Sequence, residues 1–156
     1  MANWRTLGGA ADRSVQTTVA QVMTTGDILF TITGGSIKIL EIVSECITAN
    51  NATATTMQYS STPTVGSATA ISGASGVLTS ATAGTTVRLT PTLLSTAPVI
   101  ATAAAGGVQA GVAAMTGITV QYGTLNLVLV TGPTTGTWRH YMRYSPIGAN
   151  VNVVGT

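Results

Sequence analysis

The chain has 156 residues, a length that fits one domain with or without an arm and excludes two full-sized enzyme domains. Only 6% of the residues are charged, six Lys and Arg against four Asp and Glu, whereas soluble chains average about 25%. The hydrophobic fraction of 45% and the net charge of +2 exclude a disordered chain, which combines low hydrophobicity with high net charge.

The N-terminal third of the chain predicts a series of strands. Residues 15–23 and 27–33 are rich in β-branched and apolar residues, which favour the pleated conformation. Gly34 and Gly35 then predict a tight turn, because glycine tolerates positive φ.

Residues 36–48 admit two interpretations. A helix would gather the apolar residues into one stripe opposite Lys38 and the two glutamates, but five Ile and Val among thirteen residues favour a strand. The strand must change phase near Ile39 and Leu40 for its apolar residues to share a face. A β-bulge at that point would produce the change.

Residues 53–60, 84–90 and 117–122 predict three more strands, and the small, polar residues 64–83 predict short strands and loops. The most apolar long stretch, residues 97–120, consists mostly of Ala and Gly. A membrane helix of about 20 residues would be richer in Leu, Ile and Phe. We therefore expect strand and loop there, and no membrane partner.

The C-terminal third carries the clearest alternation. In residues 124–131 three leucines alternate with Asn126, Val128 and Val130, which predicts a strand covered on both faces. The loop at 132–136 then leads into residues 137–145, and we expect the two strands to form a hairpin. One face of the second strand carries Trp138, His140, Met142 and Tyr144, and the other carries Arg139, Tyr141 and Arg143.

About eight strands in roughly 130 residues is the size of an antiparallel sandwich or jelly roll. We therefore predict an all-β fold with one antiparallel, jelly-roll-like β-sandwich domain over residues 15–145. An extended N-terminal arm covers residues 1–14, and a C-terminal tail covers residues 146–156.

The residues available for acid–base catalysis are few: Asp12, Asp27, Glu41, Glu45 and His140. Glu41 and Glu45 share a strand face and would suit a glycosidase, but such pairs more often lie on a solvated or interface side. His140 beside Ser145 or Thr137 would suit nucleophilic catalysis, but the sequence has no Gly-x-Ser-x-Gly turn and few acids to orient the ring. We expect a half-buried, hydrogen-bonded histidine and no enzyme.

Cofactors and nucleic acid are not expected either. The single cysteine, Cys46, excludes an intrachain disulfide and a cysteine-cluster metal site. The pI near 9.0 rests on a surplus of two charges, whereas nucleic-acid binding needs Lys and Arg clustered on one face. The first nine residues lack the apolar core of a secretory signal, so we expect a protein made in the cytoplasm and not exported.

The surface composition favours protein partners. The chain contains 30 Thr, 21 Ala and 18 Gly, and an exterior with so few charges is poorly protected against association. An ice-binding solenoid would also use flat Thr faces, but it needs a fixed repeat that the Thr residues at 53–56 and 85–90 do not supply. Trp and Arg are preferred anchors at interfaces, and Trp4 has no local core to enter. It either folds back on its own domain or fills a pocket on a neighbour, and we favour the neighbour. The predicted partner-binding residues are Trp4, Arg5, Arg13, Arg139, Tyr141 and Arg143.

Several short motifs lie at the ends of the predicted strands. They are Ile-Thr-Gly-Gly at 32–35, Ser-Thr-Pro-Thr-Val-Gly at 61–66, Gly-Thr-Leu-Asn-Leu at 123–127, the glycines at 132 and 136, and Tyr-Met-Arg-Tyr-Ser-Pro-Ile-Gly-Ala at 141–149. With the strand pattern between them, residues 27–153 resemble the capsid decoration, or cement, proteins of tailed bacteriophages.

The resemblance implies a β-sandwich subunit, a homotrimer, on the outer surface of the phage head. Its partner there would be the major capsid protein, at three-fold and quasi-three-fold positions. The family brings no catalytic residues and implies no small-molecule substrate. The alternative is a tail or fibre module that binds a receptor or glycan, with Trp138, Tyr141 or Tyr144 lining a groove.

Overall fold

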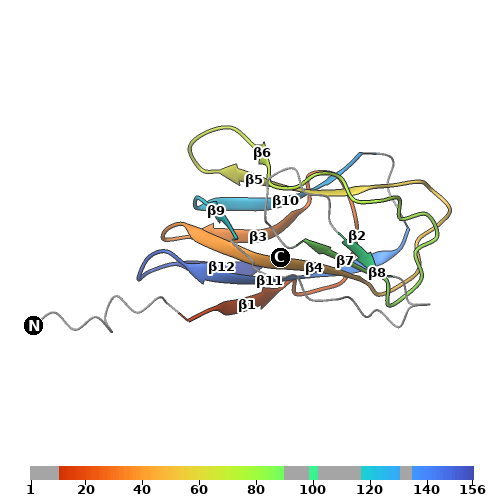
Figure 1. The fold of residues 1–156 in the computed structure, drawn as a ribbon, viewed down its shortest axis with the longest axis horizontal. Coiled ribbons are helices and arrows are strands. Elements are labelled where there is room, and N and C mark those ends of the chain that lie inside the picture. The colour runs from red at the N-terminus through yellow and green to blue at the C-terminus, as the bar shows by residue number, and fades with distance from the viewer. Residues whose placement is uncertain (1–10, 90–98, 102–116, 131–134) are drawn as a thin grey trace, which may run out of the picture.

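The computed structural model describes residues 11–89, 99–101, 117–130 and 135–156. Every regular element among them is a β-strand, and the strands form two antiparallel sheets. The predicted all-β, sandwich-like class is confirmed. Figure 1 shows most of the long strands running along the long axis of the molecule.

The larger sheet has seven strands. They are β1 (Arg13–Gln16), β2 (Gln21–Val22), β4 (Ile37–Cys46), β7 (Thr86–Leu89), β8 (Val99–Ala101), β9 (Ile118–Val120) and β11 (Thr137–Pro146). The order is β1-β11-β4-β7-β8, with β2 paired to β11 and β9 paired to β4. The long strands β4 and β11 therefore form its centre.

The smaller sheet has five strands. In their order across the sheet they are β12 (Asn152–Gly155), β3 (Ile28–Thr33), β10 (Gly123–Leu129), β5 (Met57–Pro63) and β6 (Thr69–Ala70). The same order can be followed from bottom to top in Figure 1.

The core lies between the two sheets and takes alternate residues from each. From the seven-stranded sheet, Trp138 and Ile42 are fully buried, and from the five-stranded sheet Phe30 and Leu127 are fully buried. The face of β11 that carries Trp138 is the one predicted from the alternation.

The segment 36–48 is a strand with a bulge, as predicted. Along β4 the register shifts, because Arg143 pairs with Glu41 while the next residue of β11, Tyr144, pairs with Ile39. Leu40 is left as the extra residue. Since the side-chain period of a strand is two, this single insertion lets Ile39 and Ile42 both face the core.

The turn predicted after β3 is also confirmed. Gly34 has φ +76°, and a Cβ at this position would lie 2.1 Å from the carbonyl oxygen of Asn150. Both the backbone conformation and the close approach of the neighbouring loop require glycine here.

The predicted hairpin of the last two strands is wrong. β10 pairs with β3 and β5 in the smaller sheet, whereas β11 pairs with β4, β1 and β2 in the larger one. Each strand has one strongly apolar face, and the two faces meet across the core because the strands lie in opposite sheets. β10 is accordingly covered on one face only, and Val130, just beyond it, is 60% exposed.

The segment 146–156, expected to lie outside the sandwich, instead contributes β12. This strand pairs with β3, and its Val153 is buried, as is Val151 just before it. Beside it, β1 begins at Arg13, so the last two residues of the predicted arm are already in a strand. The amide of Thr18 donates to the carbonyl of Thr156 at 2.9 Å, which closes this edge of the sandwich.

The closed edge leaves no room for a side chain at Gly155, where an added Cβ would lie 1.9 Å from the carbonyl oxygen of Gln16. We expect Gly155→Ala to lower the free energy of unfolding by about 1–3 kcal/mol, the usual cost of overpacking. Urea unfolding would measure it. Gly148→Ala, whose Cβ would meet Val151 at an ordinary 3.5 Å, is the control. Equal stabilities of the two variants would contradict the close approach.

Candidate protein-binding faces

The outward face of the seven-stranded sheet carries most of the chain's charge. Arg139, Tyr141 and Arg143 point away from the core along β11, as predicted, because their alternate neighbours are buried. Six of the chain's charged residues lie on this outward side, from β4, β7 and β11: Lys38, Glu41, Glu45, Arg88, Arg139 and Arg143. We call this side the charged face.

The acidic residues of the charged face are engaged by their neighbours. The Arg88 guanidinium forms an ion pair with Glu41. The Tyr141 hydroxyl donates to Glu45 Oε2 at 3.2 Å, and Arg139 lies directly opposite Glu45 in the register. The two glutamates do share a side of the sheet, but cross-strand partners hold them.

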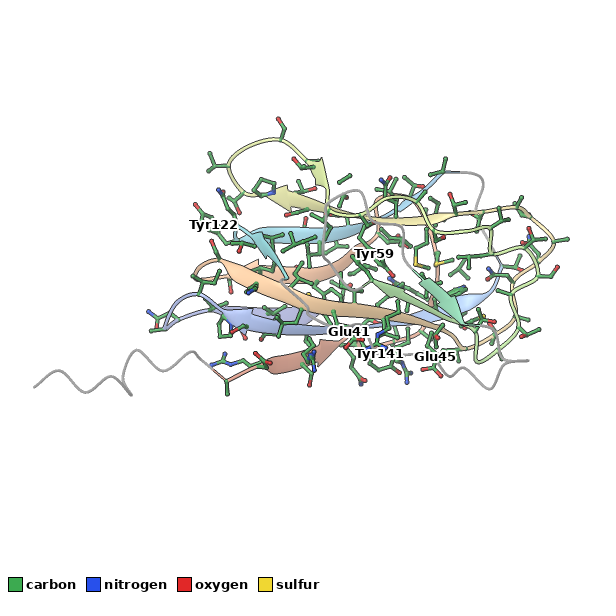
Figure 2. The ribbon with its side chains drawn as sticks, viewed as in Figure 1. Glu41, Glu45, Tyr59, Tyr122 and Tyr141 are labelled. Carbon is green, nitrogen blue, oxygen red and sulfur yellow. The ribbon has the colours of Figure 1, made fainter. Side chains whose placement is uncertain are left out.

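A shallow groove of about 260 Å³ runs along the charged face between β1 and β4. Its outward-facing lining includes Gln16, Glu41, Val43, Tyr141 and Arg143. Figure 2 shows Glu41, Tyr141 and Glu45 together on this side of the molecule, apart from Tyr59.

Four of the six predicted partner-binding residues can be placed. Tyr141 and Arg143 share the groove, and Arg139 lies two residues along the same strand face. Arg13 lies at the closed edge, where its Nη1 donates to the Val151 carbonyl at 3.2 Å. The remaining two, at positions 4 and 5, lie outside the described residues.

The aromatic groove expected of a receptor-binding module is not formed as predicted. Trp138 and Tyr144 are 0% and 4% exposed and belong to the core, so they line no groove. Of the three aromatic residues named for that alternative, Tyr141 alone reaches the surface groove.

The outward side of the five-stranded sheet has the opposite character. Among its described residues none is ionisable: Ile28, Thr31, Thr33, Gln58, Ser60, Thr62, Thr124, Asn126, Val128, Asn152 and Val154. Thr31, Thr124 and Thr62 are successive cross-strand neighbours and form a row of threonines across three strands. Ile28 and Val154 are 42% and 53% exposed. We call this side the uncharged face.

Sequence reasoning missed this separation of the two faces. The composition indicated a weakly charged exterior as a whole, without saying that the remaining charges gather on one sheet. The available signal was the alternation of β10, where the three leucines are interleaved with Thr124, Asn126 and Val128, and no charge interrupts the strand.

A buried polar cluster joins the two sheets inside the core. Ser44 Oγ of β4 lies 2.6 Å from His140 Nδ1 of β11 and 2.8 Å from the Tyr59 hydroxyl of β5. Burial lowers the pKa of His140 to about 4, and burial raises the pKa of Tyr59. Both groups are therefore neutral at pH 7.

This serine and histidine resemble a nucleophile and its base, but both side chains are buried in the core. Ser44 and His140 are 0% exposed. The expected hydrogen bond to the histidine is present, but the ring is fully buried rather than half-buried, and its partner is Ser44. The cluster is a structural contact between the sheets.

The depressed pKa of His140 makes stability depend on pH. Below the ordinary value of 6.5 the unfolded chain binds a proton that the folded chain does not bind until about pH 4. As the pH falls from 6.5 to about 4, protonation of His140 in the unfolded chain should lower the free energy of unfolding by about 3 kcal/mol. Urea unfolding at pH 7 and pH 4 would measure the loss.

An NMR titration gives an independent readout, because the chain has one histidine and its ring resonance needs no assignment. The expected midpoint is near pH 4 in the folded protein. A midpoint at or above 6.5 would contradict the burial of this ring.

No family model, curated protein or solved structure matches this chain. The described residues contain no group of three or more His, Cys, Asp or Glu side chains placed to hold a metal ion. Within the same part of the chain no helix has the length and apolarity needed to cross a membrane.

Proposed function

We propose that this chain is a structural virion protein, a capsid decoration subunit that binds the outside of an icosahedral phage head. The observation that supports the proposal most strongly is the uncharged face. A sheet surface of Thr, Ser, Asn, Ile and Val without an ionisable group opposes association less than a charged surface does. Such a surface suits a subunit that stays packed against other subunits.

The partners follow from the resemblance of residues 27–153 to decoration proteins. They are the major capsid protein and further copies of the chain in a homotrimer at three-fold and quasi-three-fold positions. The proposed role requires no catalytic residue, cofactor, nucleic acid, membrane or small-molecule substrate. The protein would be made in the host cytoplasm and reside on the outer surface of the virion head.

The mechanism is selective binding. A subunit that binds only the mature shell stabilises that shell by its binding free energy. A trimer that contacts several capsid proteins gains further, because its later contacts form at high effective concentration. The charged face, with Tyr141 and Arg143 in its groove, would supply register and specificity rather than most of the affinity.

A charge placed on the uncharged face tests the proposal. We expect Val154→Glu to weaken binding to mature heads by at least about tenfold, because a carboxylate buried without a partner costs several kcal/mol. Cosedimentation with heads would measure binding. Val77→Glu, at a position 59% exposed in the loop between β6 and β7, is the matched control and should bind normally. Equal binding by both variants would remove the uncharged face from the contact.

Copy number tests the location on the particle. In virions that carry this chain, we expect stained bands to give a number of copies approaching that of the shell protein. A few copies per virion would contradict a decoration protein and support the tail or fibre module.

A further inference from the structure

An apolar groove lies at the edge of the sandwich opposite to the edge closed by β1 and β12. It is formed between β9 of the larger sheet and the β5–β6 hairpin of the smaller one and has a volume of about 350 Å³. Ile71, Ile118 and Val120 line it and are each less than 10% exposed. Val65, also in the lining, is 73% exposed, the highest value among the large exposed apolar residues.

The strands beside this groove each pair on one side within the described part of the chain. Among the described residues, β9 pairs only with β4, and β6 pairs only with β5. An added strand could pair with main-chain groups on the other side of each strand, which no described strand occupies. An extended segment that pairs with such an edge can place alternate side chains in a neighbouring pocket.

We propose that the groove binds the N-terminal segment, residues 1–10, of a neighbouring copy, with Trp4 in the groove. The volume and the apolar lining suit one large aromatic side chain. The chain has two tryptophans, and the other, Trp138, is buried in the core. In an extended strand Arg5 would point away from Trp4. The only charged side chain of the segment would then stay outside a groove that has no ionisable residue in its lining.

The position of β1 favours a neighbour over the segment's own groove. Arg13, Tyr144, Ile39 and Ile118 form one cross-strand row through β1, β11, β4 and β9. Arg13, where β1 begins, and Ile118, which lines the groove, therefore lie at the same height on opposite edges of the sheet. Three strand spacings, or about 14 Å, separate them. Copies placed side by side in one orientation bring each segment next to the following groove. Such a head-to-tail contact closes into a ring when the rotation between copies allows it.

This contact is independent of the capsid and can be tested on the purified full-length chain. We expect the wild type to be an oligomer by analytical ultracentrifugation. Trp4→Ala and Val65→Asp should each raise the dissociation constant of the oligomer at least about tenfold. The first variant removes the tryptophan that fills the groove, and the second places a carboxylate against that tryptophan. Val77→Asp, at an exposed position that lines neither groove, should keep the wild-type mass. Circular dichroism would check that each variant is folded.

Mixing the two interface variants distinguishes a neighbour from the chain's own segment. The Trp4→Ala variant retains an intact groove, and the Val65→Asp variant retains an intact N-terminal segment. In an equimolar mixture the segment of the second variant should bind the groove of the first and form a one-to-one dimer. Absence of the mixed dimer would overturn the proposal, as would a monomeric wild type at about 100 μM or an unchanged mass for Trp4→Ala. None of these results bears on binding to the head, which the Val154→Glu cosedimentation measures separately.

Discussion

The pairing of β4 with β11 is the interaction on which the rest of the structure depends. Nine register pairs join these strands at the centre of the larger sheet, and the bulge at Leu40 divides them. Without the bulge, Ile37 and Ile39 would face solvent if Ile42 faced the core. The extra residue lets the whole strand present apolar side chains inward and its Lys and Glu residues outward. The same strand pairing therefore produces both the core and the charged face.

That register explains why the two outer surfaces of the sandwich differ. The long central strands carry five of the chain's ten charged residues, so the charges collect on one sheet, while β3, β10, β5 and β12 carry none. Ion pairs and hydrogen bonds within the charged face, such as Arg88 with Glu41, hold its acidic groups against the sheet. The uncharged face has no comparable electrostatic barrier to contact with another protein, and on this ground we propose it as the surface for permanent association.

The core also contains a polar connection between the sheets. The Ser44 hydroxyl forms hydrogen bonds with groups from both sheets. They are the imidazole of His140 in the larger sheet and the hydroxyl of Tyr59 in the smaller one. Buried polar groups are tolerated when they are paired, and here pairing fixes how the sheets lie relative to each other. The imidazole Nε2 has no hydrogen-bond partner among the described residues. This desolvated nitrogen is consistent with a ring that stays neutral.

The amino-acid sequence by itself determined several of the strands and their inward faces, although the strand predicted at 15–23 is divided into β1 and β2. The strand at 28–33, the bulged strand at 37–46 and the inward face of β11 all follow from alternation and β-branching, which are local properties. Only the tertiary structure decided which strands pair. It placed β10 and β11 in opposite sheets, made the last residues a strand, and brought His140 to Ser44 across 96 positions of the chain. Strand pairing also decided that the charged residues lie on one outer face and not on the other. The physical reason is that periodicity fixes the direction in which a side chain points, whereas pairing depends on burying every apolar face in one shared core.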